Sequence, residues 1–122
     1  MRELLPLALL ALAPPVAAQT ADSLPPGVTP ELVARGKVIY NGNGLCMACH
    51  GTNAKGVTGP DLTDTTWLHH DGSFEALVKQ ITAGIDDKAS KTGQIMPPRG
   101  GSAISDEDVK AVAAYVWTLS KH

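Results

Sequence analysis

Two cysteines and a histidine lie within five consecutive residues, Cys46-Met47-Ala48-Cys49-His50, and the 122-residue chain has no other cysteine. Two thiols three positions apart can each form a thioether with one of the two vinyl groups at one edge of a porphyrin. The histidine that follows can then supply an imidazole to the iron. The pattern C-x-x-C-H is the signature of covalent haem c attachment. We therefore predict that Cys46 and Cys49 bind one haem c and that His50 is an axial iron ligand.

Two other uses of a C-x-x-C pair are less consistent with the sequence. A thiol redox site would lie next to a strand and a helix. The residues before Cys46, however, are predicted to form a helix that runs into a turn at residues 41–44. A structural zinc site usually has four Cys or His ligands, and only three histidines remain outside the motif.

The iron needs a second axial ligand, and Met96 is the strongest candidate among the three methionines. Met1 belongs to a predicted signal peptide, and Met47 lies inside the attachment motif, on the side of the haem already committed to its histidine. Met96 is followed by two prolines, which favour an extended backbone at the methionine. A core-packing role for Met96 and ligation through His69 or His70 remain as alternatives.

Three further residues are predicted to bind the cofactor. An axial histidine usually donates its second ring N–H to an acceptor that fixes the ring plane, and the carbonyl of Pro60 is the candidate acceptor, unless Pro60 only stiffens a turn. Trp67 is predicted to pack in the core or against the haem, with its indole N–H free to reach a propionate. Arg99, just after the Met-Pro-Pro segment, completes this set. His69 and His70 are expected in solvent rather than on a metal.

A helix is predicted to begin after Thr29 as N-cap, with Pro30 at its first position. Its apolar stripe contains Gly36, which costs about 1 kcal/mol against alanine in a helix. Close approach of another helix would explain this glycine, although an incidental glycine is the alternative. The polar loop that leads to Met96, residues 85–95, has no periodicity.

Two more helices follow. The first is predicted to be capped by Ser73 and to end at Gly84, and it has apolar residues at the i, i+3, i+4, i+7 spacing of one helix face. The last is capped by Ser105, which with Asp108 resembles a capping box. Alternation typical of strands is absent from the sequence, so the predicted fold class is all-α.

The N-terminal residues indicate an exported protein. An arginine at position 2, an apolar run over residues 4–12 and small residues at 16–18 predict a secretory signal peptide over residues 1–18. Residues 19–28 are predicted to be an exposed lead-in and residues 29–122 the domain. The apolar run is too short to span a bilayer. The net charge of −2 and the absence of a Lys/Arg block argue against nucleic acid as a partner.

With these motifs the chain resembles the small class I c-type cytochromes over about residues 30–119, especially the single-haem domains of periplasmic carriers and oxidase subunits. The segment Ile104-Ser105-Asp106 is similar to the Leu-Ser-Asp that usually opens the family's last helix. The resemblance implies a cytochrome c-like fold of three to five helices around the haem. It also implies Met96 as sixth ligand and a helix crossing at Gly36 and Tyr115. The loop over residues 85–95 is longer than in compact relatives.

These observations predict a periplasmic one-electron carrier with His/Met ligation. It is expected to be a monomer, not itself an enzyme, that meets donor and acceptor redox proteins transiently and has no membrane span in its mature chain. Two alternatives are a haem c subunit of an exported oxidoreductase complex and a ligand-binding or peroxidase-like haem protein. The sequence does not distinguish a free carrier from a subunit of a complex.

Overall fold

The computed structural model describes residues 23–120, so the predicted signal peptide lies outside the described residues. The helical elements of this part are α2 (Pro30–Tyr40), α3 (Met47–His50), α4 (Phe74–Ala83), the 3₁₀ turn η1 (Pro98–Gly101) and α5 (Asp106–Leu119). Between residues 23 and 120 there is no β-strand, and the β-type pairing is one isolated antiparallel bridge between Ile85 and Met96. The predicted all-α fold class is confirmed.

The three longer helices begin at the predicted N-caps, where a hydroxyl accepts a backbone N–H of the first turn. The pairs are Thr29 with Leu32 at 3.1 Å, Ser73 with Ala76 at 3.2 Å, and Ser105 with Asp108 at 3.1 Å. The Asp108 carboxylate, predicted to complete a capping box, forms an ion pair with Arg35 of α2. The first turn of α5 is thereby linked to α2.

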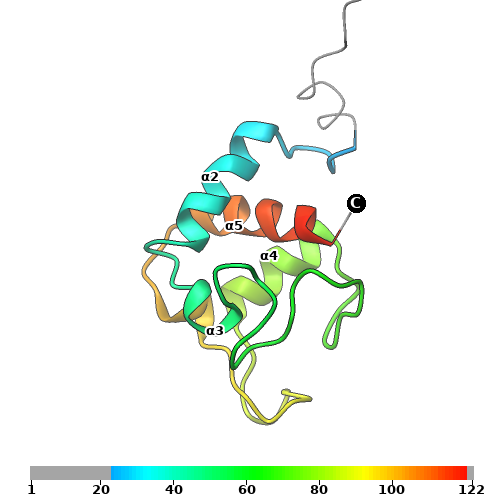
Figure 1. Cartoon of the computed structure of the whole chain (residues 1–122), viewed down its shortest axis with the longest axis vertical. Coiled ribbons are helices and arrows are strands. Elements are labelled where there is room, and N and C mark those ends of the chain that lie inside the picture. Colours follow the sequence, from blue (N-terminus) through cyan, green and yellow to red (C-terminus); the bar gives the residue numbers. More distant parts are fainter. Residues whose placement is uncertain (1–22, 121–122) are drawn as a thin grey trace, which may run out of the picture.

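Helices α2 and α5 cross in direct backbone contact at Gly36 (Figure 1). A Cβ added at Gly36 would lie 1.9 Å from the Ala111 carbonyl oxygen and 2.9 Å from the Cβ of Tyr115. Near this crossing, the ring of Tyr40 meets the ring of Tyr115 edge to face, with centroids 5.4 Å apart. The predicted close approach at Gly36 and Tyr115 is confirmed, and only glycine leaves room for it.

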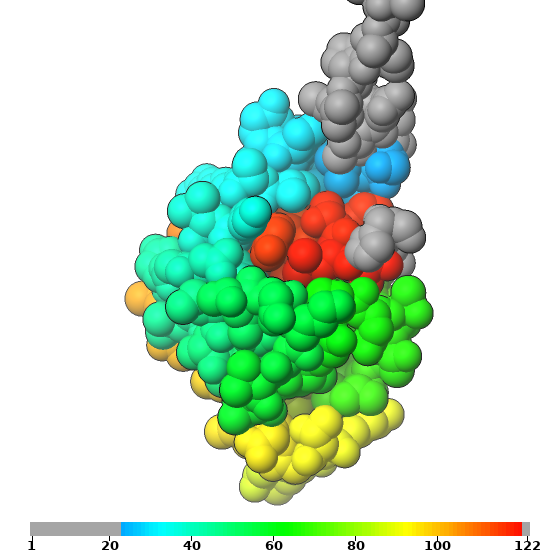
Figure 2. Space-filling model, in the orientation of Figure 1, coloured from blue at the N-terminus to red at the C-terminus, as the bar shows by residue number. Residues whose placement is uncertain are grey.

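Helix α4 packs against α5 and against η1. Long loops connect the helices, and the loop over residues 85–95 projects at the lower end of the molecule in Figures 1 and 2. Among residues 23–120, no helix has both the length and the apolar character needed to cross a bilayer. The side chains that form the core come mainly from α2, α4 and α5: Ile39, Tyr40, Leu77, Ile81, Val109, Val112 and Val116.

Candidate haem site

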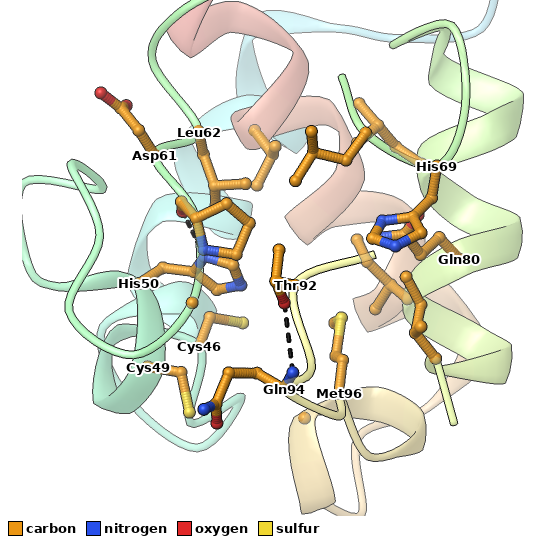
Figure 3. Close-up of a pocket in the computed structure, with 18 of the residues that line it drawn as sticks. Cys46, Cys49, His50, Asp61, Leu62, His69, Gln80, Thr92, Gln94 and Met96 are labelled. Carbon is orange, nitrogen blue, oxygen red and sulfur yellow. Dashed lines mark hydrogen bonds between the residues drawn. The ribbon is translucent and has the colours of Figure 1, made fainter. Parts of the chain in front are cut away.

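The attachment motif forms a single helical turn, α3. Leu45, directly before the motif, has a left-handed backbone with φ 61°, and Gly51, directly after it, has φ 86°, so the chain changes direction on both sides. Cys46 and Cys49, three positions apart, share one side of this turn, and both line a cavity between α3, α4, α5 and the loop before Met96 (Figure 3). Cys46 is half-buried and Cys49 is exposed, which places the pair at the cavity mouth.

The loop after α3 folds back onto the end of the motif. The backbone N–H groups of Val57, Thr58 and Gly59 all lie within 3.1 Å of the Cys49 carbonyl oxygen. This holds Gly59 flat against the His50 ring, where an added Cβ would lie 2.8 Å from Cε1. The steric need for glycine at position 59 is evident only from the structure.

The hydrogen bond predicted between His50 and Pro60 is present. The Nδ1 of His50 lies 2.9 Å from the Pro60 carbonyl oxygen. Because a carbonyl only accepts, Nδ1 carries the proton and Nε2 keeps its lone pair. Burial lowers the pKa of His50, and the bond to Pro60 opposes this shift only in part. The ring is therefore neutral at neutral pH, with Nε2 available as a metal ligand.

The environment of the cysteines argues against the two alternative uses of the motif. Burial raises the pKa of the Cys46 thiol to about 11, whereas thiol redox sites depend on a stabilised thiolate. Zinc would need further ligands close by, and residues 23–120 contain no cluster of three or more Cys, His, Asp or Glu side chains able to hold a metal ion. A cofactor bound through the thiols is more consistent with this chemistry.

Met96 lies on another wall of the same cavity, and in Figure 3 its sulfur points toward the interior. Its backbone pairs with Ile85, with N–H to carbonyl distances of 2.8 and 2.9 Å in the two directions. At Gly84 an added Cβ would lie 2.3 Å from the Met96 carbonyl oxygen. The end of α4 therefore fixes the backbone of Met96, a contact that no sequence pattern predicts.

His69 and His70 also line the cavity and are half-buried, so the expectation that they lie in solvent is wrong. The Nε2 of His69 accepts the Lys91 N–H at 3.0 Å, which ties the loop of residues 85–95 to the segment before α4. The Nδ1 of His70 accepts the Gly72 N–H at 2.9 Å. One ring nitrogen of each histidine is therefore already used by the backbone.

The remaining predicted residues divide into two groups. Pro60 and Trp67 line the cavity, and the indole of Trp67 stacks on His70 with ring centroids 5.2 Å apart. Arg99 is not among the lining residues, and its guanidinium contacts Ile104 and Asp106. Lining residues that sequence reasoning did not assign to the site include Tyr40, Gln80, Thr92, Gln94, Val112 and Val116. Of these, Tyr40, Val112 and Val116 carried a signal, their place on apolar helix stripes.

The lining has the composition that a haem c requires. Two thiols and a neutral imidazole lie on one wall, a thioether faces the same space, and much of the remaining surface is apolar. A flat, largely apolar macrocycle with an iron at its centre satisfies each of these groups. Together with the all-α fold, this donor set defines a c-type cytochrome domain of class I.

Comparison with known proteins identifies the family. Residues 31–116 match the family model described as "Cytochrome C oxidase, cbb3-type, subunit III", and the chain belongs to this family. The CcoP subunit of the cbb3-type cytochrome c oxidase of Rubrivivax gelatinosus is 39% identical over 92 residues, which is 75% of this chain and 27% of that protein. The FixP subunit of the corresponding oxidase of Bradyrhizobium sp. (strain ORS 278) is 36% identical over 90 residues, 71% of this chain and 30% of that protein. The chain thus spans less than a third of the length of these relatives.

A solved structure supports the fold. Cytochrome cL from the marine methylotrophic bacterium Methylophaga aminisulfidivorans MPT superposes with a TM-score of 0.58 at 21% identity, covering 75% of this chain and 55% of that one. At this identity the likeness concerns the fold alone. The chain is a class I c-type cytochrome domain, and its cofactor is a covalently bound haem c.

Proposed function

We propose that this chain is the electron-transferring haem c module of an exported oxidoreductase complex of the cbb3 oxidase type, and that it does not itself catalyse the reaction with the complex's substrate. The observation that carries the electron-transfer role is the single cavity lined by Cys46, Cys49, His50 and Met96. The family match and the CcoP and FixP relatives favour a complex subunit over the free periplasmic carrier expected from the sequence.

The residues of the cavity would each have a defined task. Cys46 and Cys49 would hold the macrocycle through thioethers. The Nε2 of His50 would bind the iron, in an orientation set by the Pro60 carbonyl. Met96 would be the second axial ligand. When bound, haem c supplies an iron that alternates between ferrous and ferric states and so carries one electron.

The surroundings would keep this site rigid and largely dry. Buried apolar side chains of α4 and α5, Leu77, Ile81 and Val112, line the cavity and would keep water away from a bound haem. Trp67 and the loop before Met96 cover further parts of the wall. Low access for water and two fixed axial ligands would keep the reorganisation energy of the iron site small when an electron enters or leaves. A small reorganisation energy favours rapid electron transfer between redox centres.

The ligand assignment is tested with the protein made in a host whose periplasm attaches haem to C-x-x-C-H. The oxidised wild-type protein should show the weak long-wavelength band of sulfur-to-iron charge transfer. Met96→Ala should abolish this band and let the reduced protein bind carbon monoxide, and Met96→His should lower the potential because imidazole favours ferric iron more than a thioether does. If the band is missing in the wild type and Met96→Ala changes neither spectrum nor potential, another residue is the ligand.

The affinity of the reduced protein for carbon monoxide also distinguishes an electron-transfer protein from a ligand-binding or peroxidase-like haem protein. A six-coordinate transfer site should bind the gas weakly in the wild type and strongly only in Met96→Ala. Strong binding in the wild type would favour the alternative class.

Whether the chain acts in a complex is a separate question, answered in the organism that makes it. After mild detergent extraction, a native gel stained for haem should show the tagged chain within a large complex with oxidase activity. A haem band found only at the size of the single chain would favour the free carrier.

A further inference from the structure

The turn directly after Met96 has an unusual backbone. Arg99, Gly100 and Gly101 are three successive residues with positive φ, at 54°, 68° and 83°. Glycine adopts this conformation freely, but a residue with a Cβ does so at a cost. Arg99 therefore needs contacts that compensate for its backbone conformation.

The side chain of Arg99 supplies these contacts. Its Nη1 donates to the Ile104 carbonyl oxygen at 2.8 Å, and its Nη2 donates to the carboxylate of Asp106, the first residue of α5. Its own carbonyl oxygen accepts from both the N–H and the hydroxyl of Ser102. The ion pair with Arg99 holds the pKa of the Asp106 carboxyl below its usual range. The turn after Met96 is thus bound to the N-terminus of α5.

Met96 is consequently held on two sides. On its N-terminal side, the backbone bridge to Ile85 connects it to the end of α4. On its C-terminal side, two prolines restrict the backbone and lead to Arg99 and its contacts with α5. The bridge to Ile85 uses only backbone atoms, whereas the link to α5 depends on a single side chain.

We propose that Arg99 is a positioning residue for Met96: its guanidinium fixes the turn that follows the methionine and so holds the thioether in place over the iron. The inference rests on the proposed function, in which Met96 is an axial ligand. The sequence predicted that Arg99 binds the haem directly. The positioning role takes the place of that contact, because Arg99 does not line the cavity and its guanidinium is engaged with Ile104 and Asp106.

A matched control exists on the same turn of α5. Arg35 forms the same kind of ion pair with Asp108, two positions beyond Asp106, but it connects α5 to α2 and not to the turn after Met96. Arg35→Ala removes an arginine–aspartate pair in which the arginine is the more exposed partner, without changing the contacts of that turn. A general loss of stability would affect both variants, whereas a loss of methionine positioning would affect only Arg99→Ala.

The experiment measures how easily imidazole displaces the axial methionine in the oxidised holoprotein, followed by loss of the sulfur-to-iron charge-transfer band. In Arg99→Ala the affinity for imidazole should rise about tenfold, the scale of one charged hydrogen-bonded contact. In Arg35→Ala it should stay within about twofold of the wild type. Arg99→Lys keeps the positive charge but cannot donate to Ile104 and Asp106 in the fixed geometry of a guanidinium. Its affinity for imidazole should therefore lie between those of the wild type and Arg99→Ala.

Equal affinities in Arg99→Ala and Arg35→Ala, or no change in Arg99→Ala, would overturn the inference while leaving Met96 as ligand. A wild type without the charge-transfer band would overturn the ligation by Met96 and the role of Arg99 with it. If Arg99→Ala does not accumulate as holoprotein, Asp106→Asn serves instead, because it keeps the contact with Ile104 and weakens only the ion pair. Its affinity for imidazole should rise by less than tenfold but measurably, and an unchanged value would refute the proposal.

Discussion

The α2–α5 interface and the region between α3, α4 and residues 84–97 are built from different kinds of contact. At the interface, helix backbones touch at Gly36, and Tyr40, Val109 and Ala111 are almost completely buried by other protein atoms. Around the cavity, α3, α4 and α5 share the walls with loops, which are joined to one another by hydrogen bonds such as that between His69 and Lys91. The interface needs nothing beyond the polypeptide, whereas the cavity region has its apolar surface directed toward a cofactor.

This difference indicates how stability is distributed. Without the cofactor, the cavity region should lose the apolar contacts that the haem makes with its walls. A domain of this size has a small hydrophobic core, so this loss should destabilise the cavity region strongly. The interface should then be the part of the structure that survives longest. Three substitutions test this contrast, one in each region and one at a residue that belongs to both.

The largest effect is expected from the double change of Cys46 and Cys49 to Ser. Covalent haem should disappear from a denaturing gel stained for haem, and stable folding of the chain should be lost. Hydrogen exchange read by mass spectrometry should show the remaining protection in α2 and α5, with α4 and residues 85–97 exchanging as in an unfolded chain. Equal protection of both regions in the variant would show that the cavity region does not depend on the cofactor.

A smaller but still large effect is expected at the interface, from Gly36→Ala. The added methyl group would meet the Ala111 backbone at 1.9 Å, so the helices must move apart. Over-packing of this kind costs about 3 kcal/mol in the free energy of unfolding, measured by denaturant titration of the holoprotein. The charge-transfer band of the folded fraction should persist, because the change lies away from the cavity.

Val38→Ala is the control for Gly36→Ala, because Val38 lies on the same helix with its side chain 73% exposed. Its effect should stay within about 0.5 kcal/mol. A Gly36→Ala protein as stable as this control would mean that the close crossing of α2 and α5 is not needed.

The two regions also differ in how far the sequence predicts them. The caps at Thr29, Ser73 and Ser105 depend on neighbours within three residues, so local pattern was sufficient to predict them. At Gly36 the helical stripe indicated the close approach of another helix, and the family resemblance supplied its partner on the last helix. The motif residues and Pro60 were also placed correctly relative to one another, because the loop between them is short.

The contacts around Met96 were not predictable in this way. The bridge from Ile85 to Met96, the hydrogen bond from Lys91 to His69 and the contacts of Arg99 join residues in aperiodic segments. Apart from the pair of Arg99 with Asp106, each uses a backbone group as partner, and backbone groups carry no sequence signal. Arg99 was therefore assigned to the cofactor from its position beside Met96, whereas its guanidinium contacts the beginning of α5.

The smallest of the three effects is expected at Tyr40, which belongs to both regions. Its ring is fully buried against Tyr115 of α5, and its hydroxyl donates to the Gly51 carbonyl oxygen at 2.7 Å, directly after His50. Burial raises the pKa of Tyr40 well above its usual value, so the hydroxyl remains a donor at any pH at which the domain is studied. This hydrogen bond connects α2 to the segment that carries the attachment motif.

Tyr40→Phe keeps the ring contact with Tyr115 and removes only this hydrogen bond, and the Gly51 carbonyl oxygen then accepts only from the Ala54 N–H. The free energy of unfolding of the holoprotein should fall by about 1 kcal/mol. If Tyr40 couples the regions, hydrogen exchange should rise at residues 51–59 around the end of α3 while α5 stays protected. Tyr115→Phe is the control, because it leaves the hydroxyl of Tyr40 in place. An equal rise in exchange over α5 and residues 51–59 would show that the interface and the cavity region open as one unit, and the contrast between them would fail.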